Sequence, residues 1–329
     1  MARAFRYSVS RADHCRFGIK GLVSGHRHVV VPGPVQSVLD LTLRTGRSVA
    51  NVTNFWHDSV WPEEVALQYV DLSPSEWILP RLRPWGSGSG TRVGSIVPSG
   101  YPAYARVLHP ARRTESDPVM TWRDVDVPWR EVADWSGRTY HPLMQFGAVS
   151  TPAAGTTEPS PFDQEPSTGR LFPDECHALF SVLAERTTTP DSCWLGIWEG
   201  WGTFGYPRSM SFIGPEDPEV RRMSAELVEI AERVRRAPRF EHPGRSYLLA
   251  KSTCEVICEI GRPPLDVTPS LVWPEDRAWC VGSEIDFDST LVAASEECVT
   301  ALIAEDGLEV VRVESKDRLD IEGDVLNSL

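Results

Sequence analysis

Glu284, Asp286 and Asp288 place three carboxylates at alternate positions of the chain. Side chains alternate across an extended strand, so these acids share one face if the segment is a strand. Carboxylate oxygens suit Mg²⁺ or Mn²⁺, and like charges this close repel unless water, a cation or a basic partner relieves them. The pattern predicts a divalent-metal site or, alternatively, a solvated or arginine-paired sheet face. We expect the three acids to be accessible from solvent or a cleft.

Two histidines are candidate general bases, because imidazole is the side chain that most readily exchanges protons near neutral pH. His109 precedes Pro110, and His141 precedes Pro142. No GxSxG motif accompanies them, and no serine or cysteine is marked as a nucleophile. Proline holds the residue before it in extended conformations, so ordinary turn histidines are the alternative interpretation.

A tryptophan cluster is the third candidate site. Trp194, Trp198 and Trp201 lie within one short segment, and the first two share a strand face with Gly196 and Gly200. Indoles beside glycines can form an aromatic groove that binds sugars, peptides or cations. Tryptophan at strand spacing also packs into cores, which is the alternative.

The strand that must position the carboxylates is expected over 278–287. Its other face would bury Trp279, Val281, Ile285 and Phe287. Further apolar runs predict strands at 93–97, 104–108, 193–206, 246–249, 255–259 and 308–313, whereas the charged stretch 110–118 is typical of turns. Helical spacing with start and stop residues predicts helices at 128–136, 173–186, 217–236 and 296–305. This order predicts an α+β fold, with a mixed, mainly antiparallel sheet and flanking helices.

Charge divides the chain at about residue 75. Residues 1–75 carry a net charge of +2 and the remainder carries −15, which gives −13 in total. We expect 1–75 to be a weakly ordered extension and 76–329 an α+β body. The segment 151–168 would be a flexible loop or inter-lobe linker, and residues 320–329 a frayed acidic tail. An acidic body argues against nucleic-acid binding and suits a basic protein partner.

Cysteine usage and hydropathy bear on the compartment. The seven cysteines are an odd number and most lie in apolar runs, which is typical of reduced thiols in the cytoplasm. The sequence contains no apolar run long enough to cross a membrane. We therefore expect a cytoplasmic protein, and no cofactor is indicated beyond the possible Mg²⁺ or Mn²⁺.

From about Trp77 onward the chain resembles a set of uncharacterised actinobacterial proteins. The resemblance rests on the phrases VPSGYPAYARVLHP (97–110), WREVADWSGRTYHPLMQF (129–146), TTTPDSCWLGIWEGWG (188–202) and PSLVWPEDRAWCVGSEIDFDSTLVAAS (269–295). It implies no activity, cofactor or site residue, and it does not cover residues 1–75.

Two function classes remain open. One is a non-catalytic binding or interaction protein with an acidic face and an aromatic groove. The other is a divalent-metal-assisted hydrolase or transferase built on Glu284, Asp286 and Asp288. The absence of a recognisable nucleophile, phosphate loop or closed metal motif favours the first class.

Overall fold

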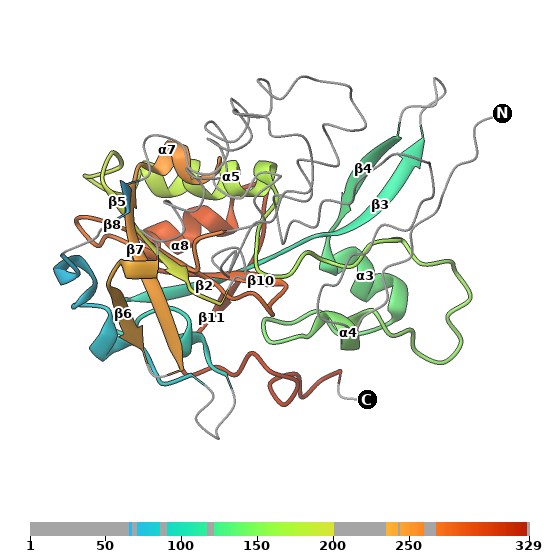
Figure 1. Ribbon diagram of the computed structural model, residues 1–329. Coiled ribbons are helices and arrows are strands. Elements are labelled where there is room, and N and C mark those ends of the chain that lie inside the picture. Colours follow the sequence, from blue (N-terminus) through green and yellow to red (C-terminus); the bar gives the residue numbers. More distant parts are fainter. Residues whose placement is uncertain are drawn as a thin grey trace, which may run out of the picture.

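A computed structural model describes residues 66–67, 71–85, 91–116, 122–200, 235–242, 244–259 and 268–327 (Figure 1). Most of the expected N-terminal extension lies outside these ranges. So do Trp201 and residues 217–234 of the expected helix 217–236. Within the described residues, no helix is long and apolar enough to span a bilayer.

In the part of the chain that the structure describes, nine strands form a central antiparallel sheet, in the order β1-β7-β5-β8-β9-β10-β2-β11, with β6 paired to β7. Every pairing in it is antiparallel. Its strands are β1 (Ala66–Leu67), β2 (Ala103–Leu108), β5 (Cys193–Trp198), β6 (Arg239–His242), β7 (Arg245–Ser252), β8 (Leu271–Pro274), β9 (Cys280–Ser283), β10 (Ser289–Ala294) and β11 (Glu309–Val313). With the flanking helices, this is the α+β fold that the sequence predicts.

Three helices cover one face of the sheet: α5 (Pro173–Ala184), α7 (Cys254–Ile257) and α8 (Glu296–Ile303) (Figure 1). Alternate strand residues point into the core beneath them, among them Val107, Leu195, Leu248, Val281 and Val292. Each large apolar side chain buried here stabilises the fold by about 1.5–3 kcal/mol relative to exposure. The helices therefore cover an apolar sheet face that would otherwise contact water.

Among the described residues, the opposite face is covered by short turns. These are 3-10 turns at Ser73–Ser75, Leu79–Arg81 and Val93–Ser95. The residues that alternate with those of the first face pack here, including Trp194, Leu249 and Trp273 against Ile78. Burial of both faces explains why several strands are almost continuously apolar.

A smaller unit lies beside the sheet, at the right of Figure 1. It contains the hairpin β3 (Ala111–Ser116) and β4 (Trp122–Val127), with helices α3 (Trp129–Ser136) and α4 (Phe146–Val149). Trp129 is fully buried at its centre and packs edge-on against Phe146, with ring centroids 5.1 Å apart. The unit follows β2 directly in the chain, so it is joined to the sheet through His109 and Pro110.

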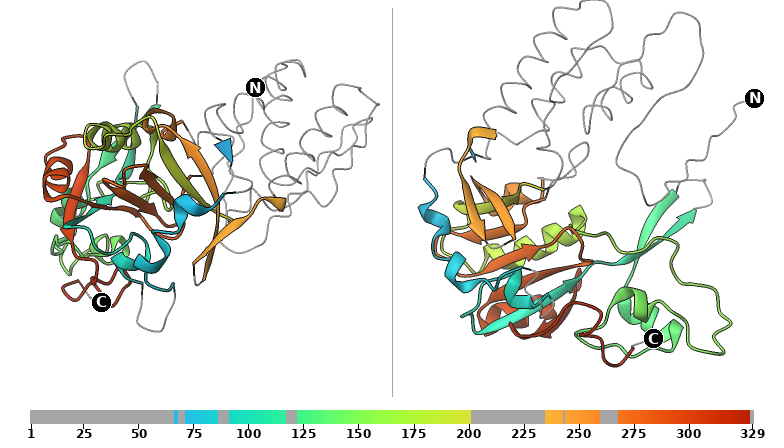
Figure 2. Two further views of the ribbon diagram at one scale, coloured as in Figure 1. Left: turned by 90° about the vertical axis from the view of Figure 1, so that its left-hand side faces the viewer. Right: turned by 60° about the horizontal axis from the view of Figure 1, so that its bottom comes forward.

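The segment 151–168 contains no helix or strand of the sheet and packs against this smaller unit. Phe162 contacts Phe146 and Trp135, and Gln164 forms a bridge to Arg112. The C-terminal segment runs past α4 (Figure 2). Its expected fraying is wrong for Asp324 and Asn327, which are 2 % and 1 % exposed and bonded to the chain.

Several local predictions are confirmed at element level. The helices α3, α5 and α8 lie where apolar spacing places them, and Ser295 caps α8 by accepting a hydrogen bond from Cys298 N. Gly137 ends α3 in the left-handed conformation, at φ 70°. Strands β5 and β11 also lie within the predicted segments 193–206 and 308–313, and β2 and β7 contain the predicted segments 104–108 and 246–249.

Other local predictions are wrong, because short apolar runs do not distinguish strands from helices. Residues 254–257 form α7 instead of a strand, and 93–95 form a 3-10 turn. The charged stretch 111–116 is strand β3 rather than a turn. The expected strand 278–287 is strand only from Cys280 to Ser283, after which the chain turns back into β10. Ile285 and Phe287 therefore lie in the connection and are only half-buried.

Candidate functional site

The three carboxylates of the acidic motif separate in the β9–β10 connection. Glu284 is buried and pairs with Arg245 at 2.8 Å, while Asp288 lies 3.5 Å from Arg106. Asp286 is exposed. Burial raises the pKa of Glu284, and Arg245 offsets part of that rise. The expectation of one accessible acidic face is therefore wrong for Glu284, while Asp288 is partly accessible beside Arg106.

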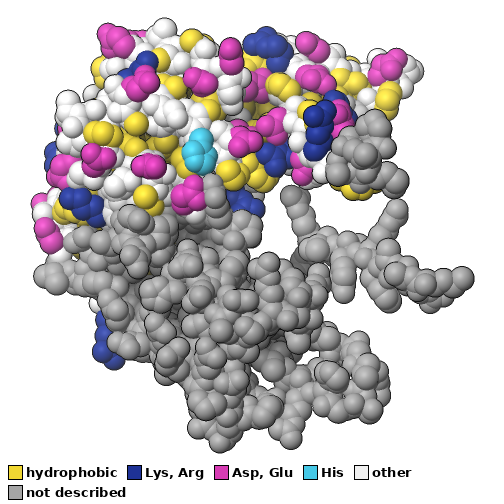
Figure 3. Space-filling model, turned by 90° about the horizontal axis from the view of Figure 1, so that it is seen from above, with side chains coloured by type: hydrophobic (Ala, Val, Ile, Leu, Met, Phe, Trp, Pro, Cys, Tyr) yellow, Lys and Arg dark blue, Asp and Glu magenta, His cyan; other side chains and the backbone are white. Residues whose placement is uncertain are grey.

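The structure gives the metal hypothesis no assembled ligand set in the part of the chain that it describes. There, no three His, Cys, Asp or Glu side chains lie where they could hold one ion together. Figure 3 shows acidic side chains interspersed with Lys and Arg over the described surface above the helices. The metal role of Glu284, Asp286 and Asp288 stays a prediction.

The tryptophan faces contact cations of the chain itself. The guanidinium of Arg245 lies 4.5 Å from the Trp198 ring and 4.0 Å from the Trp85 ring. Lys251 Nζ lies 5.0 Å from the Trp194 ring, whose Nε1 donates to Glu275 at 2.7 Å. These contacts are cation–π interactions of the usual range.

The space beside Gly196, where the sequence predicts part of an aromatic groove, is filled by the chain itself. A Cβ at Gly196 would lie 2.9 Å from Phe240. Trp194 and Trp198 thus support the sheet and one buried ion pair. Trp201 lies outside the described residues, so its expected part in a ligand groove stays a prediction.

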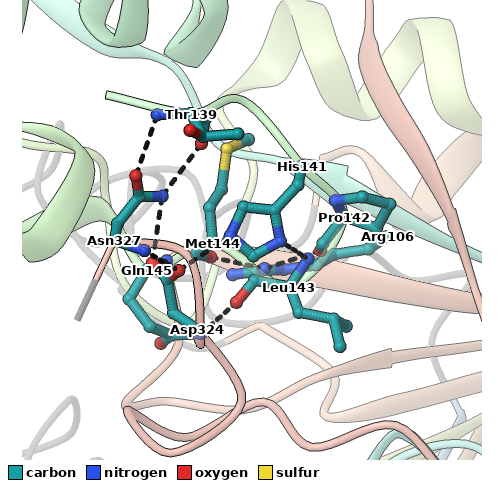
Figure 4. Close-up of polar contacts among 9 residues, drawn as sticks. All are labelled: Arg106, Thr139, His141, Pro142, Leu143, Met144, Gln145, Asp324 and Asn327. Carbon is teal, nitrogen blue, oxygen red and sulfur yellow. Dashed lines mark hydrogen bonds and ion pairs between the residues drawn. The ribbon is translucent and has the colours of Figure 1, made fainter. Parts of the chain in front are cut away.

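His141 belongs to a polar clamp that fixes the C-terminal segment (Figure 4). Its Nε2 lies 2.7 Å from Asp324 Oδ1, and its Nδ1 accepts from Leu143 N at 3.4 Å. Asp324 also accepts from the backbone nitrogens of Gln145 and Asn327. Burial alone would raise the pKa of Asp324, but these hydrogen bonds outweigh it and hold that pKa below its ordinary value.

A cleft of about 720 Å³ opens beside His141, between the β2 and β11 ends and α8. Its charged lining includes Glu296, Arg312 and Glu314, of which the first two pair at 2.6 Å. Both ring nitrogens of His141 already have partners within the chain. The geometry therefore favours a positioning role for His141 over proton transfer to a bound substrate.

His109 is fully buried, with both ring nitrogens bonded. Nδ1 lies 2.7 Å from Ser167 O, and Nε2 lies 2.9 Å from Thr290 Oγ1. Burial lowers the pKa of His109 to about 4, so the ring is neutral at pH 7. A carbonyl oxygen only accepts hydrogen bonds, so Nδ1 carries the proton and Nε2 accepts from Thr290.

This tautomer fixes the direction of a hydrogen-bond chain that ends at Ser283. Thr290 donates its only proton to His109, so its oxygen accepts from Ser283 Oγ, 2.8 Å away. Ser283 has then used its own proton and offers oxygen lone pairs. The chain therefore presents a hydrogen-bond acceptor, rather than a donor, at Ser283.

Ser283 and Thr290 line a pocket of about 160 Å³ between α5, α7 and the sheet. The rest of its lining is mainly apolar and consists of Leu171, Phe172, Pro173, Cys176, Leu179, Phe180, Ile257, Cys258, Pro269, Val272 and Val281, with the polar Arg170 and Thr268. Strand alternation explains this placement. Ser283 follows Val281 by two residues and Thr290 precedes Val292 by two, so both hydroxyls point to the helix-covered face.

Sequence reasoning identified His109 and missed its partners. Apolar spacing predicted the helix that carries Cys176, Leu179 and Phe180, but it gave no indication of a pocket beside that helix. Nothing in the sequence marked Ser283 and Thr290, which lie on either side of the acidic turn. Whether their side chains meet depends on the register of β9 against β10. Arg106, the buried partner of Asp288, was missed for the same reason.

Comparisons with known proteins do not add a site. No protein-family model, curated protein or solved structure matches the chain. Every functional assignment therefore rests on the geometry of the chain itself.

Proposed function

We propose that the protein binds a small, mainly apolar molecule with one hydrogen-bond donor, in the pocket between α5, α7 and the sheet. The observation that carries the proposal is the apolar pocket with the Ser283 acceptor at its polar end. Ligand sites of proteins commonly combine an apolar lining with a few oriented polar groups. The proposal keeps the non-catalytic binding class that the sequence favours and moves the site away from the tryptophans.

The pocket volume limits the size of the ligand. At about 160 Å³ it is close to the volume of an engineered apolar protein cavity, about 150 Å³, that binds benzene. A single aromatic ring or a short branched aliphatic chain fits this space. A drug-sized ligand does not, since the pockets that hold such ligands measure roughly 300–1,000 Å³.

The hydrogen-bond chain determines the polarity of the ligand. Because Ser283 presents lone pairs, a phenolic O–H or an indole N–H finds a partner at Ser283, whereas an ether or ketone oxygen cannot pair with Ser283. A hydrogen bond of this kind contributes about 1 kcal/mol net, which corresponds to about fivefold in affinity. The buried neutral His109 maintains this polarity, because it cannot reverse the chain without losing its bond to Ser167 O.

Calorimetric titration with phenol, anisole and toluene tests the proposal. The three probes share a ring, but only phenol can donate to Ser283. We expect saturable binding of all three, with phenol favoured by about fivefold over anisole. Saturable binding of none of them to natively folded protein would refute the proposal.

Two sets of variants locate the binding. Cys176→Phe and Val272→Phe fill the pocket from α5 and from β8, so each should abolish binding of every probe. Ser283→Ala should remove the preference for phenol and leave toluene binding. Cys298→Ser, in the core under α8 and away from the pocket lining, is the matched control. Binding that survives both filling variants would place the site elsewhere.

For the alternative, a metal-assisted hydrolase or transferase, the described residues contain no group of three ligands placed to hold one metal ion. It stays a hypothesis, and the effect of Mg²⁺ or Mn²⁺ on the melting temperature decides it.

A further inference from the structure

Two buried thiols face each other at the start of α7. Cys193 Sγ and Cys254 Sγ are 3.3 Å apart, and both cysteines are reduced. Cys193 is the first residue of β5, and Cys254 is the first residue of α7. The pair thus joins the sheet to the helix whose other end, at Ile257 and Cys258, lines the pocket.

The backbone holds the two thiols in register. Cys193 pairs with Ser252 across the β5–β7 ladder, so Cys254 follows two residues beyond that pairing. Cys254 N donates to Pro190 O at 2.9 Å, and Thr253 caps α7 by accepting from Val256 N. With the backbone held in this way, the two sulfur atoms need to move only from 3.3 Å apart to about 2.05 Å, the S–S distance of a disulfide.

We propose that Cys193 and Cys254 form an intramolecular disulfide when the protein meets a peroxide. Cys254 is the attacking thiol, because it retains 4 % exposure while Cys193 has none. The contact between the two thiols lowers the pKa of Cys254, and the same contact together with burial raises that of Cys193. Cys254 therefore has more thiolate character, and Cys193 acts as the resolving thiol.

The reaction balances with hydrogen peroxide as the oxidant. The Cys254 thiolate attacks one peroxide oxygen, the O–O bond breaks, and the product is a sulfenic acid and one water. The Cys193 sulfur then attacks the sulfenic sulfur, the S–O bond breaks, and a second water leaves. Two thiols and one peroxide thus give one disulfide and two waters, with two electrons passing from sulfur to oxygen.

A second thiol pair provides the internal comparison. Cys176 on α5 and Cys258 after α7 both line the pocket. The Cys193 and Cys254 sulfur atoms lie 3.3 Å apart, and both residues are held at the starts of β5 and α7. We therefore expect oxidation to select Cys193 and Cys254, with Cys176 and Cys258 as the alternative that peptide mapping distinguishes.

Intact-mass spectrometry and peptide mapping of the full chain test this inference. Native protein is exposed to a small excess of hydrogen peroxide, alkylated, digested without reduction and mapped. We expect a loss of two hydrogen atoms, a Cys193–Cys254 crosslinked peptide, and reversal by dithiothreitol. Cys254→Ser and Cys193→Ser should each abolish the crosslink, whereas Cys298→Ser should not.

The map of the wild-type protein decides the outcome even if a variant fails to fold. A crosslink through Cys176 and Cys258, or native protein that keeps all thiols under peroxide, would overturn the assignment. The disulfide does not depend on the proposed ligand, so failure of phenol binding would leave this result unaffected.

Discussion

Replacing Arg106 by methionine tests how the fold neutralises its acidic loop. Arg106 is 1 % exposed, and its guanidinium donates to Ser289 Oγ at 2.9 Å and to Met144 O at 2.8 Å. It also pairs with Asp288 at 3.5 Å. Methionine keeps an apolar stem of similar length beside Trp129 but removes every donor.

The magnitude follows from what the substitution leaves behind. Breaking a buried ion pair by removing one partner costs about 3–5 kcal/mol. The Asp288 side chain is 27 % exposed, so water offsets part of this loss. We therefore expect the free energy of unfolding to fall by about 3 kcal/mol, at the lower end of that range. Arg106→Lys, which keeps the charge but fewer donors, should lose less.

Urea-induced unfolding followed by tryptophan fluorescence measures the difference, and pH supplies an internal check. Burial raises the pKa of Asp288, and Arg106 counteracts that rise. Without Arg106 the pKa of Asp288 rises further, so the substitution destabilises the folded protein mainly when Asp288 is ionised. The deficit of Arg106→Met should therefore shrink as pH falls and Asp288 becomes protonated. A loss below about 1 kcal/mol, or a deficit that grows in acid, would refute the reasoning.

Three further substitutions test the other charged groups. Burial and the neighbouring Asp126 raise the pKa of Glu175 to about 7. The contribution of Glu175 to stability is therefore present below its unfolded pKa and is lost as pH rises through 7, so the melting temperature of wild type should decline over this range. Glu175→Gln should make that decline smaller. Because the pKa of Asp324 is lowered in the folded protein, its contribution to stability is present above the unfolded pKa and is lost as pH falls through the folded pKa. Asp324→Asn should therefore be less stable than wild type at neutral pH, and the difference should disappear in acid. Mg²⁺ or Mn²⁺ should raise the melting temperature of wild type no more than that of Asp286→Asn, and a larger rise in wild type would revive the metal-enzyme hypothesis.

The elements predicted best from sequence are those that local chemistry determines. Helix α5 begins at Pro173 and carries its apolar residues at helical spacing, and α8 begins after the Ser295 cap. Strands β7 and β11 contain short apolar runs of ordinary strand length. In each case the residues that predict the element lie within that element or directly beside it.

The candidate site was predicted poorly because it depends on contacts between distant segments. Whether Glu284 faces solvent or Arg245 depends on how β7 lies relative to β9, and the two residues are 39 positions apart. His109 and Thr290 are separated by 181 positions. Alternation identified which residues share a face, but it assumed that the strand continued beyond Ser283.

The β9–β10 hairpin explains how pocket and acidic loop are specified together. Ser283 and Thr290 are direct partners in its register, and their hydroxyls lie on the face that α5 and α7 cover. The residues just outside that pair, Glu284 and Ser289, bond to arginines, Arg245 and Arg106. A shift of one residue would reverse every side chain of a strand, placing Glu284 in the apolar pocket without a cation. The buried arginines therefore oppose that register as well as neutralising charge, and the same register sets the acceptor at Ser283.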